Sequence, residues 1–202
     1  IIFAKVIQKN MSTIKKIIAP LCFVAVSLVT NGQRSYQFDS VDRLFSEGKD
    51  FFELKNYAGC TDKLEAYKKV ATNNDLVQEA DYMLAYIAFE QGKNDAAEIL
   101  ESYLKRYPDS RHGDEACLLI GTYYFEREDY VLAKNWLADA RINALDAGQQ
   151  EVLNYRLAYS QMQNDDLAAA RRNFILVREY GADYSQASTY YIAYIDYATG
   201  QY

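Results

Sequence analysis

The residues of this chain that could carry out chemistry are one histidine, three cysteines and several carboxylate pairs. His112 lies in the segment SRHGDE, and no second histidine or cysteine stands at the spacing of a zinc site. No serine or cysteine forms a nucleophile pattern with it, and there is no phosphate-binding glycine-rich loop. Pairs such as Asp114-Glu115 begin or precede predicted helices, where carboxylates favour the positive end of the helix dipole. We therefore predict no catalytic residue, no metal site and no cofactor, and we expect His112 to be a solvated loop residue.

The elements that would position these residues are short amphipathic helices that repeat at a fixed interval. The repeat has one small residue on the first helix of each pair and another on the second. The first recurs in steps of 37, 36, 37 and 35 residues, at Gly48, Ala85, Gly121, Ala158 and Ala193. The second recurs in steps of 36, 37 and 37 residues, at Cys60, Ala96, Ala133 and Ala170. Two markers with nearly the same period indicate a solenoid or array.

The repeat also predicts the fold, because helix pairs this short bury their apolar faces only by stacking on one another. Helix axes approach closely where side chains are small, so we place the glycines and alanines at the helix crossings. The prediction is an all-α, right-handed superhelix of antiparallel helix pairs. Its units run from about 41 to 72, 76 to 107, 114 to 145 and 149 to 180, and a truncated unit begins at 185.

These landmarks resemble the tetratricopeptide-repeat (TPR) family. In the third unit they are Ile120-Gly121, Tyr124, Tyr130, Ala133 and Ala140. The slightly long period and the segment YLKRYPDS are similar to exported TPR proteins of Gram-negative bacteria, including the BamD-like and CpoB-like groups. The resemblance covers residues 41 to 202. It specifies the fold more closely than the function.

The N-terminal segment is typical of an export signal. Met11 is followed by two lysines and an apolar run from Ile17 to Val29, which is short for a membrane span. We predict that residues 1–32 comprise upstream residues and a removed signal peptide, and that 33–40 form a leader. The alternative is one longer N-terminal anchor. Leu21 precedes Cys22 where a lipoprotein would have a small residue, so we predict that Cys22 is not lipidated.

The charge of the chain argues against a nucleic-acid-binding protein, and the positions of its cysteines argue against a disulfide-linked one. The whole chain has a net charge of −6, and without the four lysines of residues 1–32 the remainder has 18 basic and 28 acidic residues. Such an acidic protein is a poor ligand for nucleic acid, and we predict no membrane span in the mature part. Cys60 and Cys117 lie at buried positions two units apart, so we predict no disulfide between them.

The resemblance implies that the first helices line an inner, concave surface. We predict that a partner binds aromatic side chains there, at Tyr82, Tyr86, Phe89, Phe125, Tyr155, Tyr159 and Tyr194. Lys49 is the one basic residue among the inward positions, so the clamp that some TPR proteins use for a C-terminal carboxylate is not expected.

The function that follows is a non-catalytic scaffold for protein or peptide partners, exported to the periplasm or cell envelope and associated with the outer-membrane system. One alternative is a saccharide-binding module similar to SusD-like proteins, because tyrosines also stack on sugar rings. Another is the sensor region of a larger signalling protein. The last helix, from Ser185, has no second helix after it, so we expect an N-terminal fragment that self-associates through its truncated end.

Overall fold

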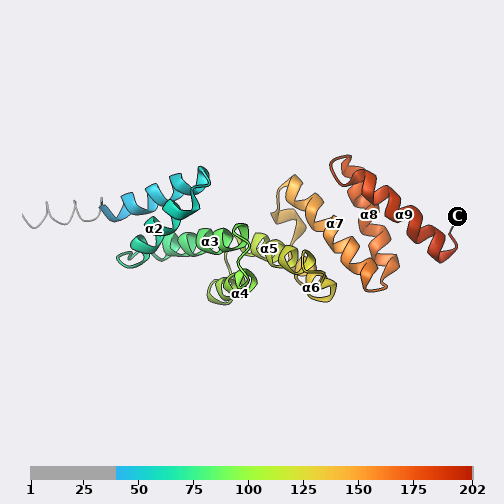
Figure 1. The fold of residues 1–202 in the computed structure, drawn as a ribbon, viewed down its shortest axis with the longest axis horizontal. Helices are drawn as coiled ribbons and strands as arrows, with labels where there is room; N and C mark the ends of the chain where they lie inside the picture. Colours follow the sequence, from blue (N-terminus) through green and yellow to red (C-terminus); the bar gives the residue numbers. More distant parts are fainter. Residues whose placement is uncertain (1–39, 202) are drawn as a thin grey trace, which may run out of the picture. The chain divides into compact units, whose positions relative to one another are not determined.

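The structure, a computed structural model, describes residues 40–201, and all of its regular secondary structure in that range is helical. The predicted signal peptide, Cys22 and most of the leader lie outside the described residues. The first helix covers 40–53 and is followed by α2 (Tyr57–Lys68). The remaining helices are α3 (Asn74–Glu90), α4 (Ala96–Arg106), α5 (Gly113–Phe125), α6 (Tyr130–Asp139), α7 (Ala147–Gln163), α8 (Leu167–Tyr180) and α9 (Ser185–Thr199), with a 3-10 turn at Ile142–Ala144 (Figure 1).

The chain divides into two compact units, residues 1–72 and 73–202. In the first, helix 40–53 packs against α2. The Cβ of any residue replacing Gly48 would lie 2.6 Å from Leu64 Cδ2, so the two helices meet where only glycine fits. Phe45 also packs between these two helices, and the centre of its ring lies 5.3 Å from the centre of the Tyr67 ring. Asn56 caps α2 by accepting a hydrogen bond from the Gly59 amide.

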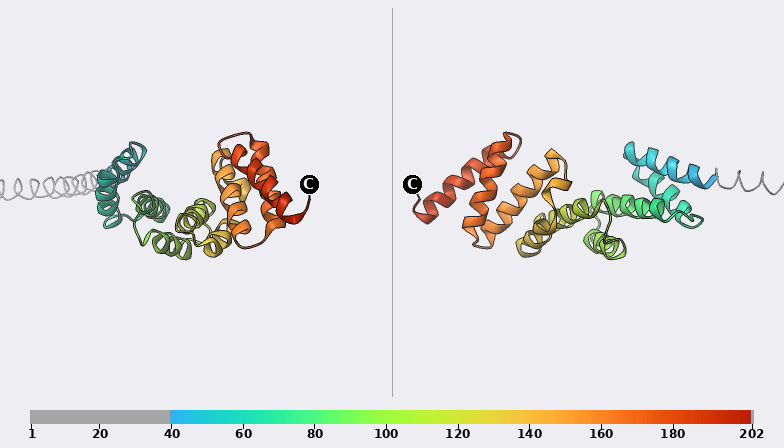
Figure 2. Two further views of the ribbon diagram at one scale, coloured as in Figure 1. Left: turned by 45° about the vertical axis from the view of Figure 1, so that its right-hand side comes forward. Right: turned by 180° about the vertical axis from the view of Figure 1, so that it is seen from behind.

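In the second unit each helix packs against the next one along the chain, from α3 through α9. The first helices of successive pairs also contact one another, α3 with α5 and α5 with α7. Figure 2 shows α7, α8 and α9 side by side in both views. These contacts establish the all-α solenoid of helix pairs that the repeat predicts. Because α3, α5 and α7 are neighbours, their side chains can form one continuous surface.

Five of the repeat alanines predicted at helix crossings are buried. The exposed fraction of the side chain is 1% or less at Ala85, Ala96, Ala133, Ala158 and Ala170. Gly121 is buried too, and a Cβ at this position would lie 2.5 Å from Leu137 Cγ. Ala193 differs, because it is exposed on α9. Residues 40–201 contain no helix after α9 that could cover it.

The residues that follow the first helix of each unit supply a third marker with the same period. One residue in each turn has a positive φ, between 55° and 70°, at Lys55, Gly92, Glu128, Asp165 and Gly200. These positions are 37, 36, 37 and 35 residues apart, as the small residues of the first helices are. Two of the five are glycine, the residue that adopts this conformation without steric cost. The other three adopt it because the packed helices on both sides fix the turn.

A buried carboxylate holds the end of α6 against the start of α5. Asp114 Oδ1 accepts hydrogen bonds from the Arg141 amide at 2.8 Å and from Nε at 3.1 Å, and Oδ2 accepts one from Nη2 at 2.9 Å. The sequence predicted a favourable interaction with the helix dipole at this position. The structure adds a bidentate partner, Arg141, from the segment that follows α6, and its hydrogen bonds lower the pKa of Asp114.

Asp114→Asn is expected to lower the melting temperature, because the amide keeps the shape of the side chain but cannot accept both guanidinium hydrogen bonds. A carboxylate with a depressed pKa stabilises the folded state above its unfolded pKa, and this contribution is lost as pH falls through the folded pKa. The difference in melting temperature between the two proteins should therefore shrink in acid. Asp109→Ala, in an exposed loop, is the control and should melt like wild type at every pH. Equal melting of the Asn variant and wild type at neutral pH would contradict the assigned pairing.

Candidate binding pocket

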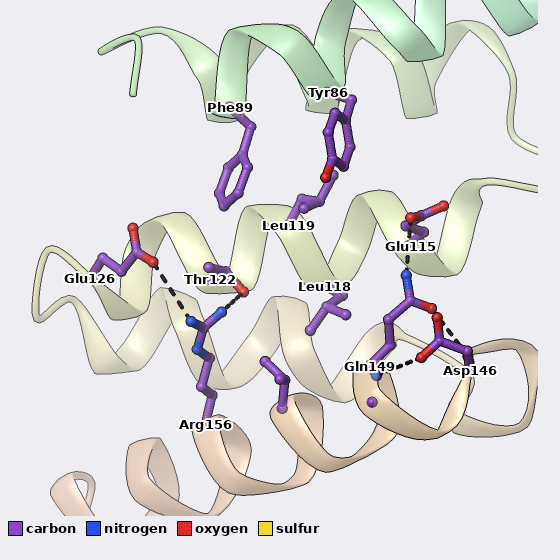
Figure 3. A pocket seen from close by; sticks show the side chains of 12 residues that line it. Tyr86, Phe89, Glu115, Leu118, Leu119, Thr122, Glu126, Asp146, Gln149 and Arg156 are labelled. Atoms are coloured by element: carbon purple, nitrogen blue, oxygen red, sulfur yellow. Dashed lines mark hydrogen bonds and ion pairs between the residues drawn. The ribbon is translucent and has the colours of Figure 1, made fainter. Parts of the chain in front are cut away.

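A pocket of about 420 Å³ lies among the first helices α3, α5 and α7. This volume is within the range of sites that bind small ligands or one to two side chains of a larger one. Side chains from all three helices line it, as Figure 3 shows. The lining residues are Tyr86, Phe89, Glu115, Leu118, Leu119, Thr122, Glu126, Asp146, Gly148, Gln149, Val152 and Arg156.

The middle of the pocket is apolar. Tyr86 and Phe89 extend from α3 towards α5, where Leu118 and Leu119 lie (Figure 3). Val152 completes this surface from α7. Leu118 is buried and the other four side chains are half-buried, so each keeps area to contact a ligand. An apolar surface between polar ends is the usual construction of a pocket that binds an amphipathic ligand.

One end of the pocket has a cation. The Arg156 side chain is only 19% exposed, donates a hydrogen bond to the Thr122 hydroxyl, and has Nη2 at 3.6 Å from Glu126 Oε1. Its guanidinium carbon lies 5.7 Å from the centre of the Phe125 ring. Burial lowers the pKa of Arg156, but arginine remains protonated in proteins. The Glu126 side chain is 55% exposed, so solvent weakens this ion pair.

The sequence analysis missed Arg156, because it placed Tyr155 and Tyr159 on the inward face of α7. The residues that line the pocket are Gln149, Val152 and Arg156, which are three and four positions apart and share one face of the helix. Arg156 is thus a basic residue at the pocket in addition to Lys49, the one base that the sequence placed on the inner face. A stripe through Tyr155 and Tyr159 has equally helical spacing, so spacing alone did not favour the stripe that contains Arg156.

The other end of the pocket has a carboxylate in a polar cluster. Glu115 Oε1 accepts a hydrogen bond from Gln149 Nε2 at 3.0 Å, and Oε2 lies 3.4 Å from His112 Nδ1. Gln149 is itself held by a capping box with Asp146 at the start of α7. Hydrogen bonding by His112 lowers the pKa of Glu115 more than burial raises it. Glu115 is therefore a fixed negative charge at the pocket edge.

His112 is not the solvated loop residue that the sequence suggested. Its ring is stacked on Tyr82, with the centres 3.9 Å apart and the planes 5° from parallel, and its side chain is 19% exposed. Nε2 lies 3.0 Å from Glu79 Oε2. Glu79 and Tyr82 belong to α3, about thirty residues earlier in the chain, so these contacts have no local sequence signal.

The seven predicted partner-binding aromatic residues do not form one continuous surface. Tyr86 and Phe89 line the pocket. Tyr82 is 4% exposed and lies beneath the pocket, against His112 and Tyr103. Tyr194 is 52% exposed on α9.

The other three predicted residues pack between helix pairs. Phe125 and Tyr159 have ring centres 5.5 Å apart, and the Tyr155 ring is stacked on Tyr184 at 4.3 Å. Burial raises the pKa of Tyr155 to about 12. All three side chains are half-buried, so they connect repeats and present only part of their surface to solvent.

The described residues contain no group of three or more histidine, cysteine or acidic side chains that could hold a metal ion. Cys60 and Cys117 are both free thiols. Burial raises the pKa of each thiol to about 11, so both are protonated at neutral pH and poorly nucleophilic. None of the helices in residues 40–201 is both long enough and apolar enough to cross a membrane.

Solved structures with a similar fold are TPR proteins. A point mutant of MamA superposes with a TM-score of 0.61 at 17% identity, over 80% of this chain and 89% of that one. The structure of MamA AMB-1 gives a TM-score of 0.59 at 16% identity, over 80% and 84%. At these identities the likeness shows the fold alone. No curated protein matches the sequence significantly.

The family of the chain follows from a match to a family model. The model described as YfiO, outer membrane lipoprotein, matches residues 38–151, which is 114 of the 202 residues. This match agrees with the resemblance to BamD-like TPR proteins that the repeat landmarks indicated. Because more than half of the chain is covered, the chain belongs to the YfiO family of TPR proteins.

Proposed function

We propose that this chain is a non-catalytic scaffold of the cell envelope that binds an extended polypeptide segment in the pocket among α3, α5 and α7. One observation carries the proposal: the pocket has an apolar middle, a carboxylate cluster at one end and a half-buried arginine at the other. Such a pocket matches an apolar side chain flanked by polar or charged groups, a pattern that polypeptides provide readily. Family and fold are of a scaffold type, and the outer-membrane description of the family supports an envelope location.

The charge of the pocket favours a partner with some positive charge. Three carboxylates, Glu115, Glu126 and Asp146, line it beside one guanidinium, Arg156. Asp146 caps α7, Glu126 lies near Arg156 and Glu115 faces Gln149 and His112, so each carboxylate has a partner, and together they exceed the single guanidinium in charge. Charges of this kind speed association and fix the orientation of a partner more than they add affinity.

The proposal is tested by photo-cross-linking in the envelope fraction. A photoreactive amino acid at the position of Leu119 should cross-link a protein partner, because this side chain faces the pocket. The same amino acid at the position of Val131, which is exposed on α6 away from the pocket, is the control. Equal cross-linking from both positions would place binding elsewhere. Recovery of glycan with no protein would favour the saccharide-binding alternative.

Removing the aromatic wall of the pocket should abolish this binding. Tyr86→Ala with Phe89→Ala is expected to cost roughly 2 kcal/mol or more in binding free energy, because buried aromatic anchors are typical hot spots. Tyr190→Ala, on the exposed face of α9, is the matched control and should bind the cross-linked partner like wild type. Affinities of the purified proteins for that partner, measured by calorimetry, decide the outcome.

We predict that a second copy of the chain binds α9. Tyr190, Tyr194 and Tyr197 are each more than half exposed there. Self-association through this helix therefore stays a prediction, and sedimentation of wild type and Tyr190→Ala would test it.

A further inference from the structure

His112 is enclosed by charged and titratable groups from each element that packs around it. Glu79 and Tyr82 face it from α3, and Glu115 faces it from α5. Arg111, beside it in the loop, donates from Nε to His112 Nε2 at 3.1 Å and from Nη2 to Glu79. Tyr103 from α4 packs against the Tyr82 ring. The ring therefore lies between two carboxylates, one arginine and two phenols.

The two ring nitrogens each face a carboxylate oxygen. Nε2 lies 3.0 Å from Glu79 and Nδ1 lies 3.4 Å from Glu115. A neutral imidazole with its proton on Nδ1 can donate only to Glu115 and can accept the Arg111 hydrogen bond at Nε2, whereas the imidazolium donates to both carboxylates and no longer accepts from Arg111. When His112 is protonated, the positive charges of Arg111 and His112 balance the negative charges of Glu79 and Glu115. Without it, the cluster carries one uncompensated negative charge.

Glu115 connects this cluster to the pocket, since it is both a partner of His112 and a lining residue. Building on the proposed function, we propose that a positively charged group of the bound polypeptide and the proton on His112 compete for Glu115. A cationic ligand then binds more tightly when His112 is neutral, and its binding expels the proton. This makes the pocket responsive to pH within the range in which histidine titrates.

The electrostatics of the free protein agree with this arrangement. Burial lowers the pKa of His112, but hydrogen bonds to Glu115 and Glu79 and their charges outweigh it, so the pKa is raised. For a histidine with a raised pKa, the stabilisation is present at low pH and is lost as pH rises through the folded pKa. The protein gives up this stabilisation in the pH range where a cationic ligand would replace the proton.

The first experiment needs no ligand. His112 is the one histidine of the chain, so its proton NMR signal in a pH titration belongs to no other residue. Glu115→Gln should lower the pKa of His112, because it removes a facing negative charge. Glu126→Gln is the matched control on the same helix, about 16 Å away along its axis, and should leave the pKa unchanged. Equal pKa values in wild type and Glu115→Gln would overturn the coupling.

The second experiment uses two end-blocked peptides built from leucine and phenylalanine, one with a single lysine and one with glutamine in its place. The lysine peptide should bind roughly fivefold or more tightly at about pH 8 than at about pH 5.5, and it should lower the pKa of His112 by the reciprocal amount. The glutamine peptide should bind equally at both. His112→Gln, checked for wild-type helix content by circular dichroism, should remove the pH dependence for the lysine peptide.

The outcomes separate this inference from the proposed function. If both peptides bind with affinities that do not depend on pH, the peptide-binding function stands and the competition with the His112 proton is wrong. If neither peptide binds at either pH, the proposed function falls and the competition falls with it.

Discussion

Gly121→Leu is expected to destabilise the protein by about 3 kcal/mol, because overpacking at a helix crossing forces the two helices apart. The first atom of any side chain added there would already lie 2.5 Å from Leu137 Cγ and 3.1 Å from the Leu137 backbone nitrogen. A side chain at Leu137 could rotate, but the backbone of α6 moves only if the crossing opens. The measurement is the free energy of unfolding in urea, or the melting temperature.

Gly113→Leu is the matched control for this crossing. A Cβ at Gly113 meets nothing nearer than Leu104 Cδ2 at 4.0 Å, so the start of the same helix has room for it. The control should unfold close to wild type. Equal losses of stability in the two variants would mean that the α5–α6 crossing does not limit the size of residue 121.

Phe174→Ala is expected to cost roughly 3–5 kcal/mol, the typical range for removing a fully buried aromatic ring. Phe174 is 0% exposed, and its ring is stacked on Tyr191 at 5.1 Å and lies edge-on to Tyr155 at 6.0 Å. The ring thus connects α7, α8 and α9, and its loss leaves a cavity at their junction.

The effect of Phe174→Ala should be local, because units of an array depend mainly on their neighbours. Amide hydrogen exchange should accelerate throughout α8 and α9 and much less in α3 and α4. Leu176→Ala, on the same helix and 46% exposed, is the control and should change exchange little. Uniform acceleration along the whole chain would show instead that the array unfolds as one cooperative body.

The fold was predictable from sequence because its determinants are local and repeated. A helix crossing needs a small residue at one position, so the repeat fixes that position in every unit, as Ala85, Gly121 and Ala158 show. The turn residues with positive φ have the same period, although the sequence does not mark them, since Lys55, Glu128 and Asp165 are not glycine. The handedness of the superhelix stays a prediction.

The candidate site was predictable only in part. Tyr86 and Phe89, which the sequence placed on the inner stripe of their helix, line the candidate pocket. Arg156 was missed because it lies one position away from the predicted stripe of α7. Tyr155 and Tyr159 face α8 and α9, so a neighbouring side of α7 faces the pocket. Single-sequence spacing cannot show which of two adjacent stripes meets the neighbouring helix pair.

The cluster around His112 had no sequence signal at all. Its members come from α3, the loop before α5 and the first turn of α5, and they meet only after two helix pairs have stacked. A stack between His112 and Tyr82 depends on ring positions fixed by tertiary packing. The prediction that His112 is a solvated loop residue rested on its polar neighbours in the sequence. Those neighbours carry no information about the stacking on Tyr82.

The neighbour-only packing of α3 through α9 has a consequence for how the chain acquires its structure during synthesis. Each helix contacts the next one or the next but one, so no contact in this unit waits for a distant segment to be made. Chains with such local topology fold quickly, and domains fold progressively from the N-terminus as the ribosome proceeds. The pocket needs only α3, α5 and α7, so it can form before α8 and α9 emerge. A nascent chain arrested after residue 163, plus enough residues to clear the exit tunnel, should therefore already protect Leu118 and Leu119 from proteolysis.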